Sequence, residues 1–231
     1  MSYKEEIEIQ RQEAQNHQTA NKILTLMKAL RMDATDTSER RWIWELIQNA
    51  KDVGYGNANV EIEINLQLDV TNGKVSFSHN GQPFTVKNIT YLIQQESSKD
   101  RIHTEGVQPK TTGKFGTGFL TTHLLSEIVT VEGVVIKENL PPKKFSLDLD
   151  RSGRDIQPII ESVNLSFEQL NTLDTLSDFT AFTDGHINTT FSYKLNEKGI
   201  KVAQTGLNDF HISIPFVLSF IPSIKRILVK S

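Results

Sequence analysis

The sequence predicts an α+β fold, and three observations lead to this prediction. Two segments with the apolar spacing of helices come first, at 3–31 and 38–53. A strand–turn–strand pattern follows at 60–78, and the second half of the chain is mostly strand-like with helical connections. With 231 residues, the chain is long enough for one domain with a sizeable core and, at most, an appendage.

Composition narrows the class of protein. The chain has no cysteine, which excludes disulfides and cysteine-based metal sites and fits a reducing cytosol. A net charge of −3 gives no strong signal for nucleic acid or for anionic membranes. The polar N-terminus is unlike a signal peptide, and the most apolar run, 212–228, is interrupted by prolines and basic residues. We therefore expect a cytoplasmic protein that does not span a membrane.

The first part of the chain is predicted to be helical. Residues 1–33 form a helical extension whose beginning is too polar to bury a face, so it should lie on the surface or against a partner. The rest, 34–231, forms the domain. Its first helix, 38–53, follows a break rich in residues that can N-cap it: Asp36, Thr37 and Ser38. It should end near Gly54.

A hairpin is predicted next. The alternation of apolar and polar residues at 60–68 indicates a half-buried strand, and Asn72-Gly73 favours a tight turn into a returning strand at 74–78. Directly after it comes His79-Asn80-Gly81, a turn at a strand end where glycine allows a ligand to approach the backbone. A helix is predicted at 86–95.

A polar, irregular segment at 96–114 is long enough to suggest a functional lid or disorder. It leads into Gly113-Lys114-Phe115-Gly116-Thr117-Gly118-Phe119 and a predicted helix at 120–125. Glycines that open a helix offer free backbone N–H groups and the positive end of the helix dipole, which suit a phosphate. Taken alone, a glycine string of this kind is more often an ordinary turn.

The second half is predicted to be rich in strands, at 128–136, 144–149, 156–163, 179–182, 189–195 and 225–229. Pro141-Pro142 and Ser152-Gly153 indicate turns between strands. A short helix at 166–173 is expected to open on a capping box of Ser166 and Gln169. Another helix should begin at 197 and end at 207 or continue to 218.

The helix at 38–53 carries the residues best suited to chemistry. Glu45, Asn49 and Asp52 fall within an arc of about 60°, beside an apolar stripe. Their oxygen atoms suit a hard cation such as Mg²⁺, and a carboxylate can order a water molecule. An ordinary surface helix explains this stretch equally well when it is considered alone.

In combination and in this order, these segments resemble the GHKL family of ATPases, named after gyrase, heat-shock-ninety chaperones, histidine kinases and MutL. The resemblance covers about residues 38–195 and is closest to the sacsin-like and heat-shock-ninety-like branch. The family's first box, Glu-x-x-x-Asn-x-x-Asp, matches Glu45, Asn49 and Asp52. The resemblance implies that Glu45 activates the attacking water, that Asn49 binds Mg²⁺ and that Asp52 supports the nucleotide site.

The family's second box reads Asp-x-Gly-x-Gly, and its Asp accepts a hydrogen bond from the adenine amino group. Here Gly81 is kept, whereas His79 and Pro83 replace the Asp and the second Gly. A neutral His79 can accept the same bond through one ring nitrogen, with help from Asn80. A turn histidine exposed to solvent is the alternative.

The third box is the glycine-rich segment. Lys114 and Phe115 resemble the sacsin and MORC versions, in which the Lys contacts the γ-phosphate. The resemblance implies that the phosphates bind along Gly116, Thr117, Gly118 and Phe119. Thr189 opens a strand where the family often has Gly-Thr, which implies a position near the adenine.

The resemblance also implies a fold and an activity. The fold would be a two-layer α/β sandwich of the Bergerat type, with a mixed, mostly antiparallel sheet and helices on one face. ATP and Mg²⁺ would be the cofactors, and slow hydrolysis would drive lid closure and self-association of the N-terminal domain. We expect the chain to be the N-terminal part of a longer chaperone-like or clamp-like protein, of a kind that also occurs in phage defence, with further domains downstream.

Two alternatives remain open. The first is a nucleotide-sensing scaffold that binds ATP without hydrolysing it. The second is a protein-interaction domain with a vestigial pocket, against which the retention of Glu45, Asn49 and Lys114 argues.

Overall fold

A computed structural model describes residues 2–32, 36–55, 60–95 and 118–231. The strands are β1 (Ile62–Asp69), β2 (Lys74–His79), β3 (Phe84–Thr85), β4 (Ile128–Lys137), β5 (Leu140–Asp150), β6 (Thr189–Lys194) and β7 (Ile224–Lys230). The helices are α1 (Tyr3–Met32), α2 (Asp36–Asp52), α3 (Val86–Gln94), α4 (Ile156–Asn171) and α5 (Glu197–Phe220), with short 3₁₀ helices η1 (Phe119–Leu124) and η2 (Leu173–Thr175).

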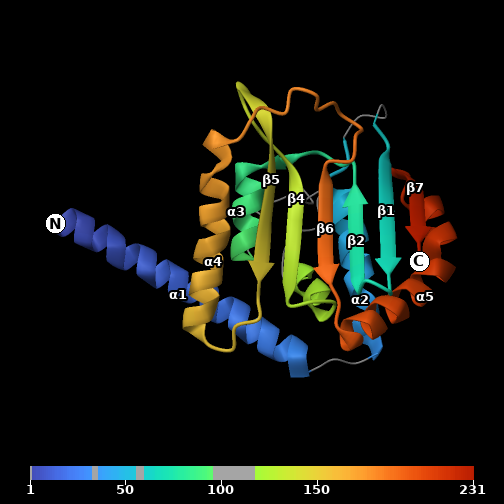
Figure 1. Ribbon diagram of the computed structural model, residues 1–231, viewed down its shortest axis with the longest axis horizontal. Helices are drawn as coiled ribbons and strands as arrows, with labels where there is room; N and C mark the ends of the chain where they lie inside the picture. The colour runs from blue at the N-terminus through green and yellow to red at the C-terminus, as the bar shows by residue number, and fades with distance from the viewer. Residues whose placement is uncertain (1, 33–35, 56–59, 96–117) are drawn as a thin grey trace, which may run out of the picture.

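The described strands form one mixed sheet. Their order is β3-β4-β6-β2-β1-β7, and β5 pairs with β4 outside this path (Figure 1). The pairs β1–β7 and β3–β4 are parallel, whereas the other four are antiparallel. The predicted α+β class with a mixed, mostly antiparallel sheet is therefore confirmed.

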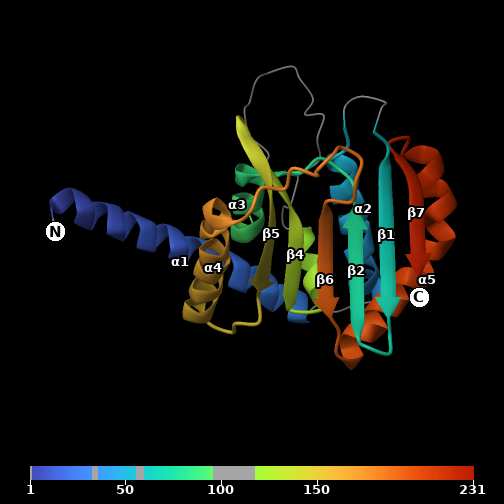
Figure 2. The same cartoon turned by 45° about the horizontal axis from the view of Figure 1, so that its top comes forward.

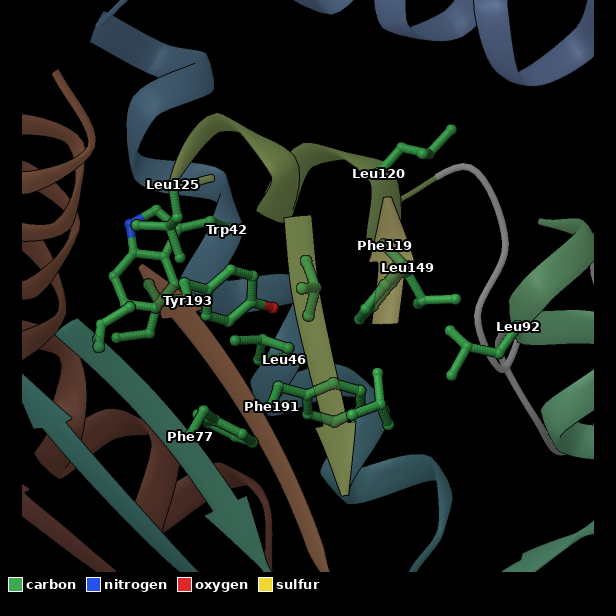
Figure 3. Packing of buried hydrophobic residues seen from close by; sticks show 14 of the residues in the cluster. Trp42, Leu46, Phe77, Leu92, Phe119, Leu120, Leu125, Leu149, Phe191 and Tyr193 are labelled. Carbon is green, nitrogen blue, oxygen red and sulfur yellow. The ribbon is translucent and has the colours of Figure 1, made fainter. Parts of the chain in front are cut away.

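The core lies between the sheet and the helices. Alternate residues of β6 are buried, while those between them are half-buried or exposed, as expected for a strand with one covered face. Trp42 and Leu46 of α2 belong to the same buried cluster as Phe77, Phe191 and Tyr193 of the sheet (Figure 3). Burying such large side chains supplies much of the hydrophobic driving force of the fold.

Helix α1 has two unlike halves. Its first half is exposed and projects beyond the rest of the molecule in both views (Figures 1 and 2). Its second half is amphipathic and buries Ala20, Ile23, Leu24 and Met27 at the spacing of one helix face. None of the described helices is both long and apolar enough to cross a membrane.

The predicted strand at 156–163 was wrong, because these residues begin α4. The segment contains β-branched residues, which favour strands. However, Ile156, Ile159, Ile160 and Val163 repeat at helical spacing, and Pro158 lies in the first turn, where a helix tolerates it. Helical periodicity outweighed local propensity.

The predicted capping box at 166–169 was also wrong, since Ser166 lies inside α4. Its hydroxyl donates to the carbonyl oxygens of Asp148, at 2.7 Å, and of Ser162, at 3.0 Å. The serine thus links α4 to β5 instead of opening a helix.

Two further expectations for the second half were wrong. Pro141 and Pro142 lie within β5, and the turn is at Asn139, which has a positive φ of 61°. Among the named strands, β5 pairs only with β4, and a strand at the edge of the sheet accommodates residues that lack an N–H. Residues 179–182 form no strand; an isolated bridge between Lys143 and Asp178 lies beside them.

Candidate functional site

Helix α2 places Glu45 at the margin of the core. The apolar residues of α2 face the sheet, and Glu45, one turn before Asn49, retains only 20% of its side-chain exposure. Its Oε1 lies 3.4 Å from Nη2 of Arg41, an (i, i+4) ion pair on a largely exposed arginine. Such surface pairs contribute little to stability, so Arg41 orients the carboxylate more than it anchors the helix.

Asn49 is buried, with 5% of its surface exposed. Its Nδ2 has no hydrogen-bond partner among the described residues. Its N–H group is therefore available to donate to a water or a ligand. Asp52, at the end of α2, is half-buried.

His79 ends β2 and is almost completely buried, so it is not an exposed turn histidine. Burial lowers its pKa to about 3, which keeps the ring neutral. Its Nδ1 accepts a hydrogen bond of 3.1 Å from the backbone N–H of Gly81. A neutral ring carries one proton, and since Nδ1 is an acceptor this proton is on Nε2. The Nε2–H group is therefore a hydrogen-bond donor.

Asn80 has a role within the protein itself. Its Oδ1 accepts from the backbone N–H of Glu63 at 2.7 Å, and its Nδ2 donates to the carbonyl oxygens of Glu61 and Gly185. These bonds hold the turn against the start of β1 and against a distant loop. Its predicted assistance in binding a base stays a prediction.

Gly81 brings the turn into contact with the end of α2. A Cβ at this position would lie 2.4 Å from Cγ2 of Val53, too close for any side chain. The next residue, Gln82, donates its backbone N–H to the carbonyl of Val53 at 2.7 Å. Glycine is therefore required here for close packing of the first two predicted boxes.

Two residues of this site were not predicted. Asn188 is buried; its Nδ2 donates to the carbonyl of Gly81 at 2.6 Å, and its Oδ1 accepts from the hydroxyl of Thr189 at 2.9 Å. Tyr55 donates to Asp184 at 3.2 Å, and burial together with that carboxylate raises its pKa to about 12. The only sequence signal was the polar Asn188-Thr189 pair at a strand start.

The third box meets the first at Gly118. A Cβ on Gly118 would lie 2.1 Å from Oε2 of Glu45, so the carboxylate rests directly against the glycine. The ring of Phe119 lies 5.4 Å from that of Phe191, which in turn lies 6.4 Å from the ring of His79. Lys114, Phe115, Gly116 and Thr117 lie outside the described residues.

The structure therefore brings parts of three separate segments together: the end of α2, the turn after β2 and the start of η1. No cluster of three or more His, Asp or Glu side chains is present among the described residues, so these alone do not enclose a metal ion. If Mg²⁺ binds here, the amide oxygen of Asn49 is the protein ligand available to it, and phosphate oxygens and waters would complete its coordination, as Mg²⁺ often binds.

Acidification is expected to destabilise the protein through two histidines. Burial lowers the pKa of His79 and of His123 to about 3, and Arg151 also acts on His123. Below the unfolded value of 6.5, the unfolded chain binds protons that the folded chain does not. Each histidine should therefore lower the free energy of unfolding by about 1.4 kcal/mol at about pH 5.5, and urea unfolding measures this change.

The variant His79→Gln serves as the check on this pH dependence. Between about pH 7.5 and pH 5.5, the two histidines together lower the free energy of unfolding, and this variant should show about half of that decrease. An unchanged dependence in this variant would show that other groups are responsible.

When compared with protein-family models and with curated proteins, the chain has no match in either.

Proposed function

We propose that this chain is a Mg²⁺-dependent ATP-binding module of the GHKL type that hydrolyses ATP slowly. The contact between Glu45 and Gly118 is the main support. It joins the carboxylate expected to activate water to the glycine expected to hold phosphate, although β1, β2, β3 and α3 lie between the two residues in the sequence. The α+β fold with a mixed sheet is compatible with a Bergerat-type sandwich.

In this proposal, each group has a separate task. The Glu45 carboxylate orients or deprotonates the attacking water, and Asn49 supplies an amide oxygen to Mg²⁺. Bound Mg²⁺ would neutralise phosphate charge as it develops. Because Gly118 has no side chain, the Glu45 carboxylate can lie directly against the backbone that is expected to bind phosphate. Lid closure and self-association would follow nucleotide binding in a longer protein.

The test is a comparison of wild type with Glu45→Ala and with Asn49→Ala. Calorimetry with and without Mg²⁺ measures ATP binding, and phosphate release measures hydrolysis. We expect Glu45→Ala to bind ATP but lose hydrolysis, and Asn49→Ala to lose the Mg²⁺ dependence of binding. Gln48→Ala, an exposed change on the same helix, is the control and should resemble wild type. Equal hydrolysis in wild type and Glu45→Ala would refute the catalytic role.

Binding without phosphate release in the wild type would instead support the scaffold alternative. Absence of nucleotide binding in all variants would favour a protein-interaction domain. The unfolding midpoint of every variant should also be recorded, because a loss of binding or hydrolysis is informative only in a variant that is folded.

The hydrogen bond at His79 leads to a prediction about the base. An adenine amino group is a donor and does not pair with the Nε2–H of His79, which is also a donor. We expect ATP and GTP to bind the wild type with affinities within about tenfold of each other. His79→Asp restores an acceptor and should shift the preference toward ATP by about tenfold or more. Competition calorimetry measures both; a strong wild-type preference for ATP would contradict the prediction.

A further inference from the structure

A pocket lies at the opposite end of the sheet from the candidate nucleotide site. The pairing of β2 with β6 shows the separation, since His79 pairs with Thr189 at one end and Lys74 with Lys194 at the other. The pocket has a volume of about 430 Å³ and is formed by the end of α1, the η1–β4 junction, the turn after β5 and the β6–α5 junction. That volume lies in the range of small-molecule sites.

The charged residues that line the pocket are mostly basic. They are Arg31, Arg154, Lys194 and Lys198, with Glu127 as the one carboxylate among the described lining residues. His123 also lines the pocket, and burial keeps it neutral. The pocket therefore holds an excess of three positive charges on a chain whose net charge is −3. Such a local field attracts anions.

Glu127 already accepts hydrogen bonds from both arginines of the pocket, Arg31 and Arg154. Its Oε1 accepts from Nε of Arg31 at 2.7 Å and from Nη1 of Arg154 at 3.0 Å, and its Oε2 accepts from Nη2 of Arg154 at 3.1 Å. Partial burial acts to raise the pKa of Glu127, but these hydrogen bonds outweigh it and the pKa is lowered. The carboxylate stays ionised and holds both guanidinium groups at the pocket.

Lys194 and Lys198 are not neutralised in this way. Neither has an ion-pair partner among the described residues. Lys194 also lies directly across the strand pair from Lys74, and like charges in that arrangement repel each other. An anion bound beside Lys194 would offset the positive charge concentrated there.

The remaining lining residues indicate what kind of anion fits. Met27, Leu30 and Leu124 form an apolar part of the wall. Ser126, Ser152 and Asn196 supply polar atoms beside the cations. A ligand that uses the whole pocket therefore combines an anionic head with an apolar body.

We propose that this pocket binds a small organic phosphate, with its phosphate group between Lys194 and Lys198 and its organic part against Leu30 and Leu124. Lysine ammonium groups bind phosphate as point charges, and the fixed guanidinium of Arg154 completes a cationic rim. The site does not depend on nucleotide binding at the other end of the sheet.

The test uses phenyl phosphate and inorganic phosphate as probes in calorimetry at low ionic strength. The double variant K194Q/K198Q removes the two unpaired charges without disturbing Glu127. The control K201Q/K230Q removes two exposed lysines that do not line the pocket. We expect wild type and control to bind phenyl phosphate more tightly than inorganic phosphate, and the lining variant to bind it about tenfold more weakly or worse.

Three outcomes would overturn the proposal: no binding of phenyl phosphate by the wild type, equal binding by the lining and control variants, or tighter binding of inorganic phosphate than of phenyl phosphate. The first two exclude this pocket as an anion site, and the third excludes the apolar contact. Equal unfolding midpoints of the two variants would show that both are folded.

Discussion

Replacing Gly118 by alanine is expected to reduce ATP hydrolysis to the level of Glu45→Ala. The new Cβ would lie 2.1 Å from Oε2 of Glu45, so the carboxylate has to move by more than an ångström. A displacement of that size at a catalytic group costs about a hundredfold in rate. The φ of Gly118 is −60°, a value that alanine adopts without strain, so the effect should come from the contact with Glu45 and not from the backbone.

A double-mutant cycle separates this effect from general damage. In the Glu45→Ala background no carboxylate is left to displace, so adding Gly118→Ala should cause little further loss of phosphate release. Additive losses would mean that the glycine acts independently of Glu45. Unfolding midpoints of all four proteins show whether the alanine disturbs the fold.

Replacing Asn80 by alanine is expected to lower the free energy of unfolding by about 3 kcal/mol. The side chain is 2% exposed and makes hydrogen bonds to the backbone at Glu63, Glu61 and Gly185. Without the amide, these three backbone groups lose their partner in a part-buried environment, and each such loss is costly. Urea unfolding monitored by circular dichroism measures the change.

Asn65→Ala is the matched control for this prediction. Asn65 lies on β1, is half-buried and has no side-chain hydrogen bond among the described residues. Its replacement should change stability by no more than about 0.5 kcal/mol. If the two variants are equally stable, the hydrogen bonds of Asn80 do not hold the turn.

The features that could be predicted from the sequence are those set by local chemistry. The Asn72-Gly73 turn is an example, since Gly73 has a φ of 57° that suits glycine, and it joins two antiparallel strands as expected. The periodicity of α2 likewise predicted which residues face the core. In both cases, the residues that determine the structure are close together in the chain.

Some features that were not predicted depend on distant partners, and others on how local signals compete. Asn188 holds the carbonyl of Gly81 across 107 residues, and no local pattern indicates that bond. His79 was predicted as an acceptor for a base, but the N–H of Gly81 already uses its acceptor nitrogen. Residues 156–163 begin α4 although they include β-branched residues, because their apolar side chains repeat at helical spacing.

The division within α1 bears on where this protein can be shortened. A boundary at residue 33 looks natural in the sequence, yet it would remove Ile23, Leu24 and Met27 from the core and Arg31 from its pairing with Glu127. A cut before Thr19 removes only side chains that are already solvated or nearly so. The outer half of α1 can therefore be removed without disturbing the core, whereas the inner half is part of the folded domain.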